Sequence, residues 1–191
     1  MTGIAERELS ILLLSSRYDL SPFDSGDAEL NDFLKNDALR EQKEFLSKTH
    51  LCFYRDRVAG FISMAADSVQ AKKDKLDPSQ IIDDCEYPVY PCILIARLAV
   101  DKKLHGYGVG SYLLSLAVGY AMESPLGCRY LAVDPKDGAL EFYEKIDLIF
   151  TTLLFRSPFN LFQILASATF PSFLLPVPQA ASPRACQRTH A

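Results

Sequence analysis

The chain has 191 residues, of which 49% are apolar, and this composition excludes a disordered chain and allows a substantial core. Its formal net charge of −4 gives no general reason to expect an anionic membrane or nucleic acid as partner. The first sixteen residues place acids ahead of a very short apolar run, which is unlike a signal peptide. The five cysteines show no CxxC pair, so we expect free thiols and a cytoplasmic protein.

The first half of the chain predicts a strand, a helix and a hairpin. Residues 8–16 form a short apolar run, and residues 21–27 have turn chemistry with Ser25 or Asp27 available to cap a helix. The helix should follow, because apolar residues recur near helical spacing at Leu30, Phe33, Leu34, Ala38 and Phe45. Two apolar runs around a polar turn predict a hairpin over 49–66. Residues 67–88 are polar and mixed, which indicates an irregular crossing or a short helix.

The second half alternates strands and helices. Residues 92–100 are almost continuously apolar, which predicts a central strand covered on both faces. Residues 111–122 are apolar almost all round and predict a buried helix, residues 128–133 a further strand, and residues 135–146 a helix with Pro135 near its start. This βαβα order requires parallel neighbouring strands. The fold class is therefore α/β, with a mixed sheet flanked by helices.

A turn with three glycines separates the central strand from the buried helix, in "RLAVDKKLHGYGVGSYLL" at 97–114. The first amides of a helix have no intrahelical partner and the helix dipole favours negative charge there, so such a turn can bind an anion. Spacing alone leaves a merely tight turn as the alternative. The spacing disfavours a Rossmann fingerprint, and the absence of GKS or GKT excludes a P-loop. The histidines show no metal-ligand spacing, so we expect no metal site.

The glycine turn resembles motif A of the GCN5-related N-acetyltransferases (GNAT), and "DGALEFYEKI" at 137–146 resembles their motif B. The upstream "YDLSPFDSGDAELNDFLKNDA" is similar to the toxin-like branch of that family. The resemblance covers residues 10–146. It implies a GNAT fold and transfer of an acetyl group from acetyl-coenzyme A (acetyl-CoA) to a primary amine.

The resemblance also implies roles for individual residues. The backbone amides of the glycine turn would bind the pyrophosphate of acetyl-CoA, and the main chain of the preceding strand would run beside its pantetheine arm. Tyr143 matches the tyrosine that protonates the departing thiolate. The turn residues are Gly106, Tyr107, Gly108, Val109, Gly110 and Ser111, and the strand residues are Leu98, Ala99 and Val100.

The charged residues near these motifs leave alternatives open. His105 stands where the family has Arg or Gln, and its ring either donates to a phosphate or is an exposed loop histidine. Lys102 and Lys103 either meet the outer phosphate or stay solvated. Arg97 either lies near the active site or only ends a strand face. No Glu or His is an obvious base, so we expect the amine to lose its proton through water.

The acceptor and the partners are the least determined features. Aminoacyl-tRNA is one acceptor class, with Lys35, Arg40 and Lys43 as candidate phosphate contacts, although the overall acidity disfavours strong binding to nucleic acid. A protein or small-molecule amine is the other class, and a non-catalytic CoA-binding module is the alternative to an enzyme. The toxin-like branch implies a ribbon-helix-helix antitoxin as partner and leaves a homodimer open.

The family pattern stops after Ile146, where Asp147-Leu148 stands in place of the family's Gly-Phe. We therefore assign 1–147 to an acetyltransferase domain and 148–191 to an atypical apolar tail. Residues 148–191 carry no acid, no Lys and no Gly. Loss of one G from GGA-TTT-A would give GAT-TTA and hence Asp-Leu, so a frameshift is one hypothesis, with C-terminal strands altered or missing. A membrane span is the disfavoured alternative, because three prolines interrupt residues 157–177; disorder or aggregation is expected instead.

Overall fold

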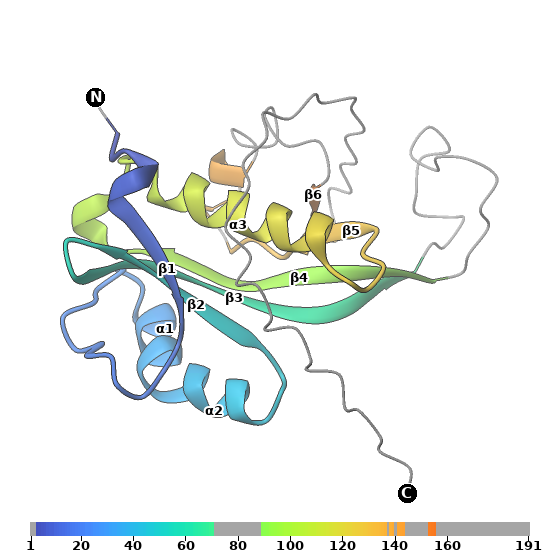
Figure 1. Ribbon diagram of the computed structural model, residues 1–191, viewed down its shortest axis with the longest axis horizontal. Helices are drawn as coiled ribbons and strands as arrows, with labels where there is room; N and C mark the ends of the chain where they lie inside the picture. The colour runs from blue at the N-terminus through green and yellow to red at the C-terminus, as the bar shows by residue number, and fades with distance from the viewer. Residues whose placement is uncertain (1–2, 71–88, 137, 140, 144–152, 156–191) are drawn as a thin grey trace, which may run out of the picture.

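A six-stranded mixed sheet forms the middle of the molecule (Figure 1). The computed structural model describes residues 3–70, 89–136, 138–139, 141–143 and 153–155. The strands are β1 (Leu9–Leu13), β2 (Lys48–Tyr54), β3 (Arg57–Gln70), β4 (Val89–Val100), β5 (Tyr130–Val133) and β6 (Leu153–Phe155), and they lie in that order. The first four pair antiparallel, whereas β5 pairs parallel with β4 and β6 parallel with β5. The predicted parallel neighbours are confirmed.

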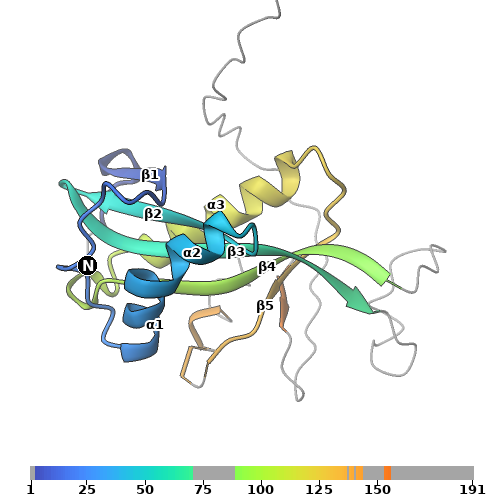
Figure 2. The ribbon, with the colours of Figure 1, turned by 90° about the horizontal axis from the view of Figure 1, so that it is seen from below.

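Helices cover both faces of this sheet, as predicted. One face packs against α1 (Ala28–Asp32), the π-helical turn η2 (Phe33–Asp37) and α2 (Ala38–Lys43), which Figure 2 shows lying across the sheet. The other face packs against α3 (Val109–Glu123). Side chains of β4 reach both cores, because Ile95 belongs to the core under α3 and Ala99 to the core under α1 and α2. The expectation of a central strand covered on both faces is confirmed.

The predicted hairpin is present and is longer than expected. Arg55 and Asp56 form its two-residue turn with φ values of 48° and 63°, the left-handed conformation of a type I′ turn. Strand β3 continues to Gln70, so the first residues of the segment expected to be irregular are a strand. Residues 71–88 lie outside the described residues.

The first helix begins where the sequence predicts, but the helical segment ends earlier than predicted. The Asp27 carboxylate accepts hydrogen bonds from the Glu29 and Leu30 amides at 2.8 and 3.1 Å, so Asp27 is the cap, while Ser25 bonds to Asn31. The prediction of Phe45 as a residue of the buried helix face is wrong. Helix α2 ends at Lys43, and Phe45 lies in the following turn with φ of 60° and 84% exposure.

Helix α3 is only half buried, which corrects the expectation of a helix buried all round. Its buried residues lie in its first nine positions, among them Leu113, Leu114 and Ala117. Tyr120 and Met122, near its end, are 44% and 65% exposed. Only one face of the sheet is available to α3, so an apolar sequence on every side of the helix does not produce burial on every side.

The C-terminal part of the chain is described only in short pieces. Residues 141–143 are helical, within the helix predicted over 135–146, and β6 adds one strand after residue 148. The hypotheses of a frameshift and of a disordered tail concern residues that lie, apart from β6, outside the described part of the chain. Within that part, every helix is too short or too polar to cross a bilayer.

Candidate active site

The edge of β4 that faces β5 becomes free halfway along the strand. Strand β5 pairs only with Cys92 to Ile95, whereas β3 pairs with β4 as far as Val100. A bulge leaves Ala96 without a pairing partner on β3, and bulges bend and twist a strand locally. Among the described strands, none pairs with the β5 side of Leu98, Ala99 and Val100. Backbone groups on such an edge can bind an extended ligand as a further strand would.

The glycine turn follows directly on this free edge. A short 3-10 helix, η4 (Lys102–Leu104), leads into it, and α3 begins at Val109. Gly106 and Gly108 have φ values of 81° and 90°, which L residues with a side chain rarely adopt. A Cβ atom at either position would meet nothing within 4 Å, so these two glycines face open space.

The start of α3 presents backbone amides toward this open space. Gly108 is the N-cap residue and has no side chain to accept hydrogen bonds from the first turn. The amides of Val109, Gly110 and Ser111 belong to that turn and have no intrahelical acceptor. Open space beside two glycines and uncapped amides at a helix start are together suited to an anion.

Gly110 differs from the other two glycines, because it makes room for a side chain. A Cβ atom there would lie 2.9 Å from Cζ of Phe142 and 3.6 Å from Cγ2 of Val100. The helical residues 141–143 therefore pack directly against the first turn of α3. Phe142 was not among the predicted site residues, although its place beside Tyr143 in the second motif was a usable signal.

Tyr143 lies in the same core as the start of α3. It is 5% exposed and belongs, with Val109, to the cluster against which Leu98 and Val100 also pack. Its ring meets that of Phe142 edge to face at 5.1 Å. Burial raises the pKa of Tyr143 to about 12, so its hydroxyl keeps its proton at neutral pH. A neutral, buried hydroxyl is a competent proton donor.

The position of His105 determines which of its ring nitrogens can donate a hydrogen bond to a phosphate. Nε2 lies 2.9 Å from the carbonyl oxygen of Val100, so Nε2 carries a proton and donates it to the backbone. In the neutral ring Nδ1 is then an acceptor only. His105 in this conformation can donate to a phosphate only as the imidazolium, and otherwise it helps to hold the turn.

Arg97 lies on the α1 side of the sheet, away from α3. Its guanidinium stacks over the ring of Phe33 with 5.2 Å to the centroid, and Nη1 donates to the carbonyl of Ala96 at 2.8 Å. Its Nε is buried without a hydrogen-bond partner among the described residues. Arg97 directly follows the bulge of β4, and a role for it in the active site stays a prediction.

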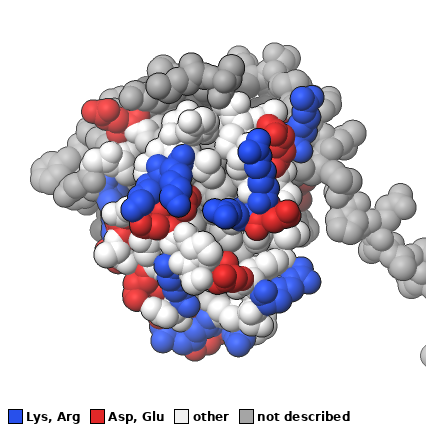
Figure 3. Space-filling view, turned by 90° about the vertical axis from the view of Figure 1, so that its left-hand side faces the viewer, with Lys and Arg blue, Asp and Glu red and all other residues white. Residues whose placement is uncertain are grey.

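Some of the candidate phosphate contacts already have partners within the described residues. Arg40 pairs with Asp37 at 2.7 Å, Lys102 pairs with Asp24, and Nζ of Lys35 lies 3.5 Å from a backbone carbonyl. Figure 3 shows the end of the molecule with the β2–β3 turn, where basic and acidic side chains are interspersed. That face offers no unbroken basic surface.

Two further contacts of the glycine turn were not predicted from the sequence. The Ile4 amide donates to the carbonyl of Tyr107 at 3.0 Å, and the buried Asp101 carboxylate accepts from the Lys103 amide at 2.9 Å. An Asp directly before "KKL" could have been read as a cap. The contact with the N-terminal segment had no local signal.

Comparison with known proteins agrees with this geometry. Residues 11–147 match the Acetyltransferase (GNAT) family. A tRNA-acetylating toxin of Mycobacterium tuberculosis (strain ATCC 25618 / H37Rv) is 35% identical over 137 residues, which are 70% of this chain and 80% of the relative.

The similar solved structures include two at 25% identity. AtaT complexed with acetyl-methionyl-tRNAfMet has a TM-score of 0.60 and is matched over 72% of this chain and 85% of its own. AtaTR bound with AcCoA has a TM-score of 0.60, over 73% and 85%. The GNAT fold is thereby confirmed, and the chain belongs to the GNAT family of acetyltransferases.

Proposed function

We propose that this chain is an N-acetyltransferase that transfers the acetyl group of acetyl-CoA to the amino group of an aminoacyl-tRNA. One observation carries the chemistry: the free edge of β4, the uncapped start of α3 and the buried Tyr143 meet around one core. Membership of the GNAT family supports the reaction, and the name of the 35% identical relative supports the acceptor.

The residues present fit acetyl-CoA. The open side of Gly106 and Gly108 and the uncapped amides from Val109 to Ser111 suit the pyrophosphate, because charge-assisted hydrogen bonds to backbone amides are strong. The free backbone edge at Leu98 suits an amide of the pantetheine arm, whereas the carbonyl of Ala99 lies toward Gly60 of β3. The amide of Tyr107 already donates to the carbonyl of Leu104 at 3.3 Å, and the carbonyl of Val100 is engaged by His105, which leaves the Val100 amide.

Acetyl-CoA supplies an activated acyl group, and the chain supplies position and a proton. The amine must attack as the neutral base, and it forms the new C–N bond as the C–S bond breaks. Tyr143 gives its hydroxyl proton to the departing sulfur, and the proton lost by the amine passes to water and so returns to the tyrosinate. The raised pKa of Tyr143 ensures that this donor is protonated at the start of each turnover.

The acceptor and partners follow from the relatives and from charge. Lys35 and Lys43 are proposed phosphate contacts on α1–α2, and Arg40 joins them on release from Asp37. Because Arg40 is paired with Asp37 and the formal net charge of the chain is −4, affinity for tRNA should show a shallow salt dependence. We further propose a cytoplasmic toxin neutralised by a ribbon-helix-helix antitoxin, acting as a homodimer.

The test is release of free thiol from acetyl-CoA with a panel of acceptors: charged tRNAs, uncharged tRNAs, peptides and small amines. We expect turnover only with charged tRNA and a fall in kcat of about 100-fold in Tyr143→Phe. Tyr120→Phe is the matched control, because Tyr120 is 44% exposed at the far end of α3 and should keep full activity.

Gly108→Glu tests whether the glycine turn binds acetyl-CoA. A glutamate would place a side chain and a like charge where the pyrophosphate is proposed, so binding of acetyl-CoA should be abolished. Turnover with peptides or small amines, but not with charged tRNA, would show that aminoacyl-tRNA is not the acceptor. Binding of acetyl-CoA without thiol release from any amine, unchanged in Tyr143→Phe, would reject catalysis and leave a CoA-binding module.

A further inference from the structure

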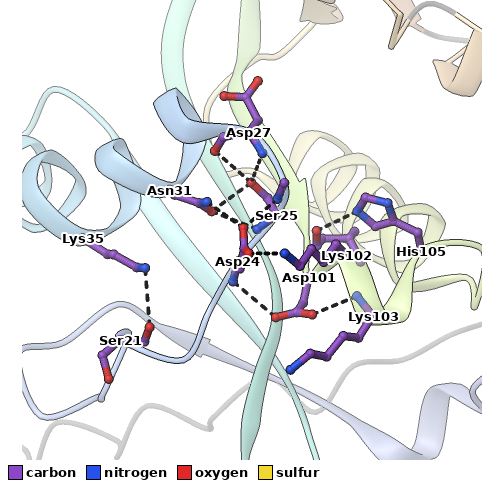
Figure 4. A network of polar contacts seen from close by, with 12 residues as sticks. Ser21, Asp24, Ser25, Asp27, Asn31, Lys35, Asp101, Lys102, Lys103 and His105 are labelled. Atoms are coloured by element: carbon purple, nitrogen blue, oxygen red, sulfur yellow. Dashed lines mark hydrogen bonds and ion pairs between the residues drawn. The ribbon is translucent and has the colours of Figure 1, made fainter.

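The turn that follows β4 is fastened to a loop far away in the sequence. Figure 4 shows the loop before α1 and the turn at 101–105 joined by a polar network. The Lys102 amide donates to the carbonyl of Asp24 at 2.9 Å, and the Lys102 ammonium pairs with the Asp24 carboxylate. Asp24 and Asp101 are 77 residues apart in the chain, so the network joins the α1 side of the molecule to the glycine turn.

Asp101 is the buried centre of this network. It is 8% exposed, and its two carboxylate oxygens accept from different segments. Oδ1 accepts from the Lys103 amide at 2.9 Å, and Oδ2 from the Asp24 amide at 3.3 Å. Its own amide donates to the carbonyl of Ala59 on β3 at 2.8 Å. One side chain thus connects the turn, the loop and the sheet.

Asp24 supports the network from the other side. Its Oδ1 accepts from the Gly26 amide and from Nδ2 of Asn31, both at 2.9 Å. The hydrogen bond from Lys102 lowers the pKa of Asp24 well below its usual range, so the carboxylate is charged at neutral pH. The loop is therefore tied both to α1, through Asn31, and to the turn, through Lys102.

The Asp101 carboxylate lies in the segment before the proposed phosphate site, where a negative charge is electrostatically unfavourable for a polyanionic ligand, whereas the charge of Asp24 is paired with Lys102. The charge of Asp101 alone would weaken binding of acetyl-CoA. Its hydrogen bonds, in contrast, set the path of the backbone directly before Gly106 and Gly108. The two effects have opposite signs, so a measurement of affinity can separate them.

We propose that Asp101, supported by Asp24, is a positioning residue that holds the cofactor-binding turn in the conformation that receives the pyrophosphate. The inference rests on the proposed binding of acetyl-CoA at this turn. Asparagine at position 101 keeps the shape of the side chain but replaces one acceptor by a donor, which must then face a backbone amide. The Asp101 side chain should therefore lose one of its two hydrogen bonds, to the Lys103 amide or to the Asp24 amide.

Isothermal titration with acetyl-CoA tests this, in 0.5 M salt, where the Debye length of about 4 Å removes most of the charge effect. We expect Asp101→Asn to bind five- to tenfold more weakly, with kcat at saturating acetyl-CoA within twofold of the wild type. Asp24→Asn should weaken binding in the same direction. Because both act on one network, the double variant should lose less than the product of the single effects.

Asp32→Asn is the matched control, since Asp32 is an exposed carboxylate at the end of α1 whose side chain, among the described residues, bonds to Asn36 of η2 and not to the turn after β4. Thermal unfolding of each variant ensures that binding is measured well below its Tm, where a loss of stability alone leaves Kd unchanged. If Asp101→Asn is unfolded, Asp24→Asn decides the question.

Equal or tighter binding by Asp101→Asn in 0.5 M salt would overturn the positioning role while leaving the proposed function intact. A wild-type chain that does not bind acetyl-CoA would overturn both.

Discussion

Replacing Gly110 with alanine should displace Tyr143, the proposed proton donor, indirectly through its neighbour Phe142. The added Cβ would lie 2.9 and 3.0 Å from Cζ and Cε2 of Phe142, whereas carbon atoms pack best at about 3.5–4.0 Å. Phe142 must therefore move by about 0.6 Å, and Tyr143 is its neighbour in the chain. Overpacking costs about 1–3 kcal/mol, and the gain in helix propensity offsets at most about 1 kcal/mol.

The expected result is a small loss of stability and a larger loss of activity. A net cost of about 1 kcal/mol lowers Tm by about 2–4 °C in a chain of this size. A misplacement of about 1 Å can cost about 100-fold in rate, so a shift of about half that size should lower kcat about tenfold. Affinity for acetyl-CoA should change much less, because the amide of residue 110 is kept.

The assay compares Tm, kcat and the acetyl-CoA KM for Gly110→Ala and Gly119→Ala. Gly119 lies in the same helix, and a Cβ there would meet nothing within 4 Å. Gly119→Ala should therefore raise Tm and leave kcat unchanged. If the two variants have the same Tm and the same kcat, the packing of Phe142 on Gly110 does not position Tyr143 and the reasoning is wrong.

Two further predictions concern pH and helix capping. Because burial raises the pKa of Tyr143 to about 12, kcat should show no descending limb from this group between pH 7 and 10; a limb in that range that disappears in Tyr143→Phe would contradict the raised pKa. Asp27→Ala should cost about 1 kcal/mol at pH 7, measured by urea unfolding against Asp32→Ala, because Asp27 caps α1. The hydrogen bond from the Leu30 amide lowers the pKa of Asp27, so this stabilisation is present above about pH 4 and is lost as pH falls; a difference that persists at pH 2 would contradict the charge-dependent cap.

Much of the fold could be predicted from local patterns, and the errors have physical causes. The hairpin, the central strand and the parallel unit depend on periodicity and turn chemistry within short windows. Phe45 was misplaced because helix α2 ends at Lys43 and Phe45 itself adopts a left-handed conformation in the turn that follows. Nothing in its apolar side chain signals that conformation. The exposed end of α3 was missed because periodicity does not show how far the sheet extends beneath a helix.

The candidate site was predictable in its parts rather than in its arrangement. The glycine turn and Tyr143 could be chosen because two motifs occur in order. Their separate uses could not be distinguished, since Gly106 and Gly108 serve backbone conformation whereas Gly110 serves the packing of Phe142. The assignments of the individual cofactor contacts and of the domain boundary at residue 147 remain predictions.

The sequence by itself determined the order of the elements, the family and the residues able to carry the chemistry, because those properties reside in short stretches of chain. Only the tertiary structure decided where β4 and β5 part, which glycine makes room for Phe142, and that Asp24 reaches Asp101 across 77 residues. Such contacts depend on how the loop before α1 meets the turn after β4, and no local pattern encodes a meeting of segments so far apart.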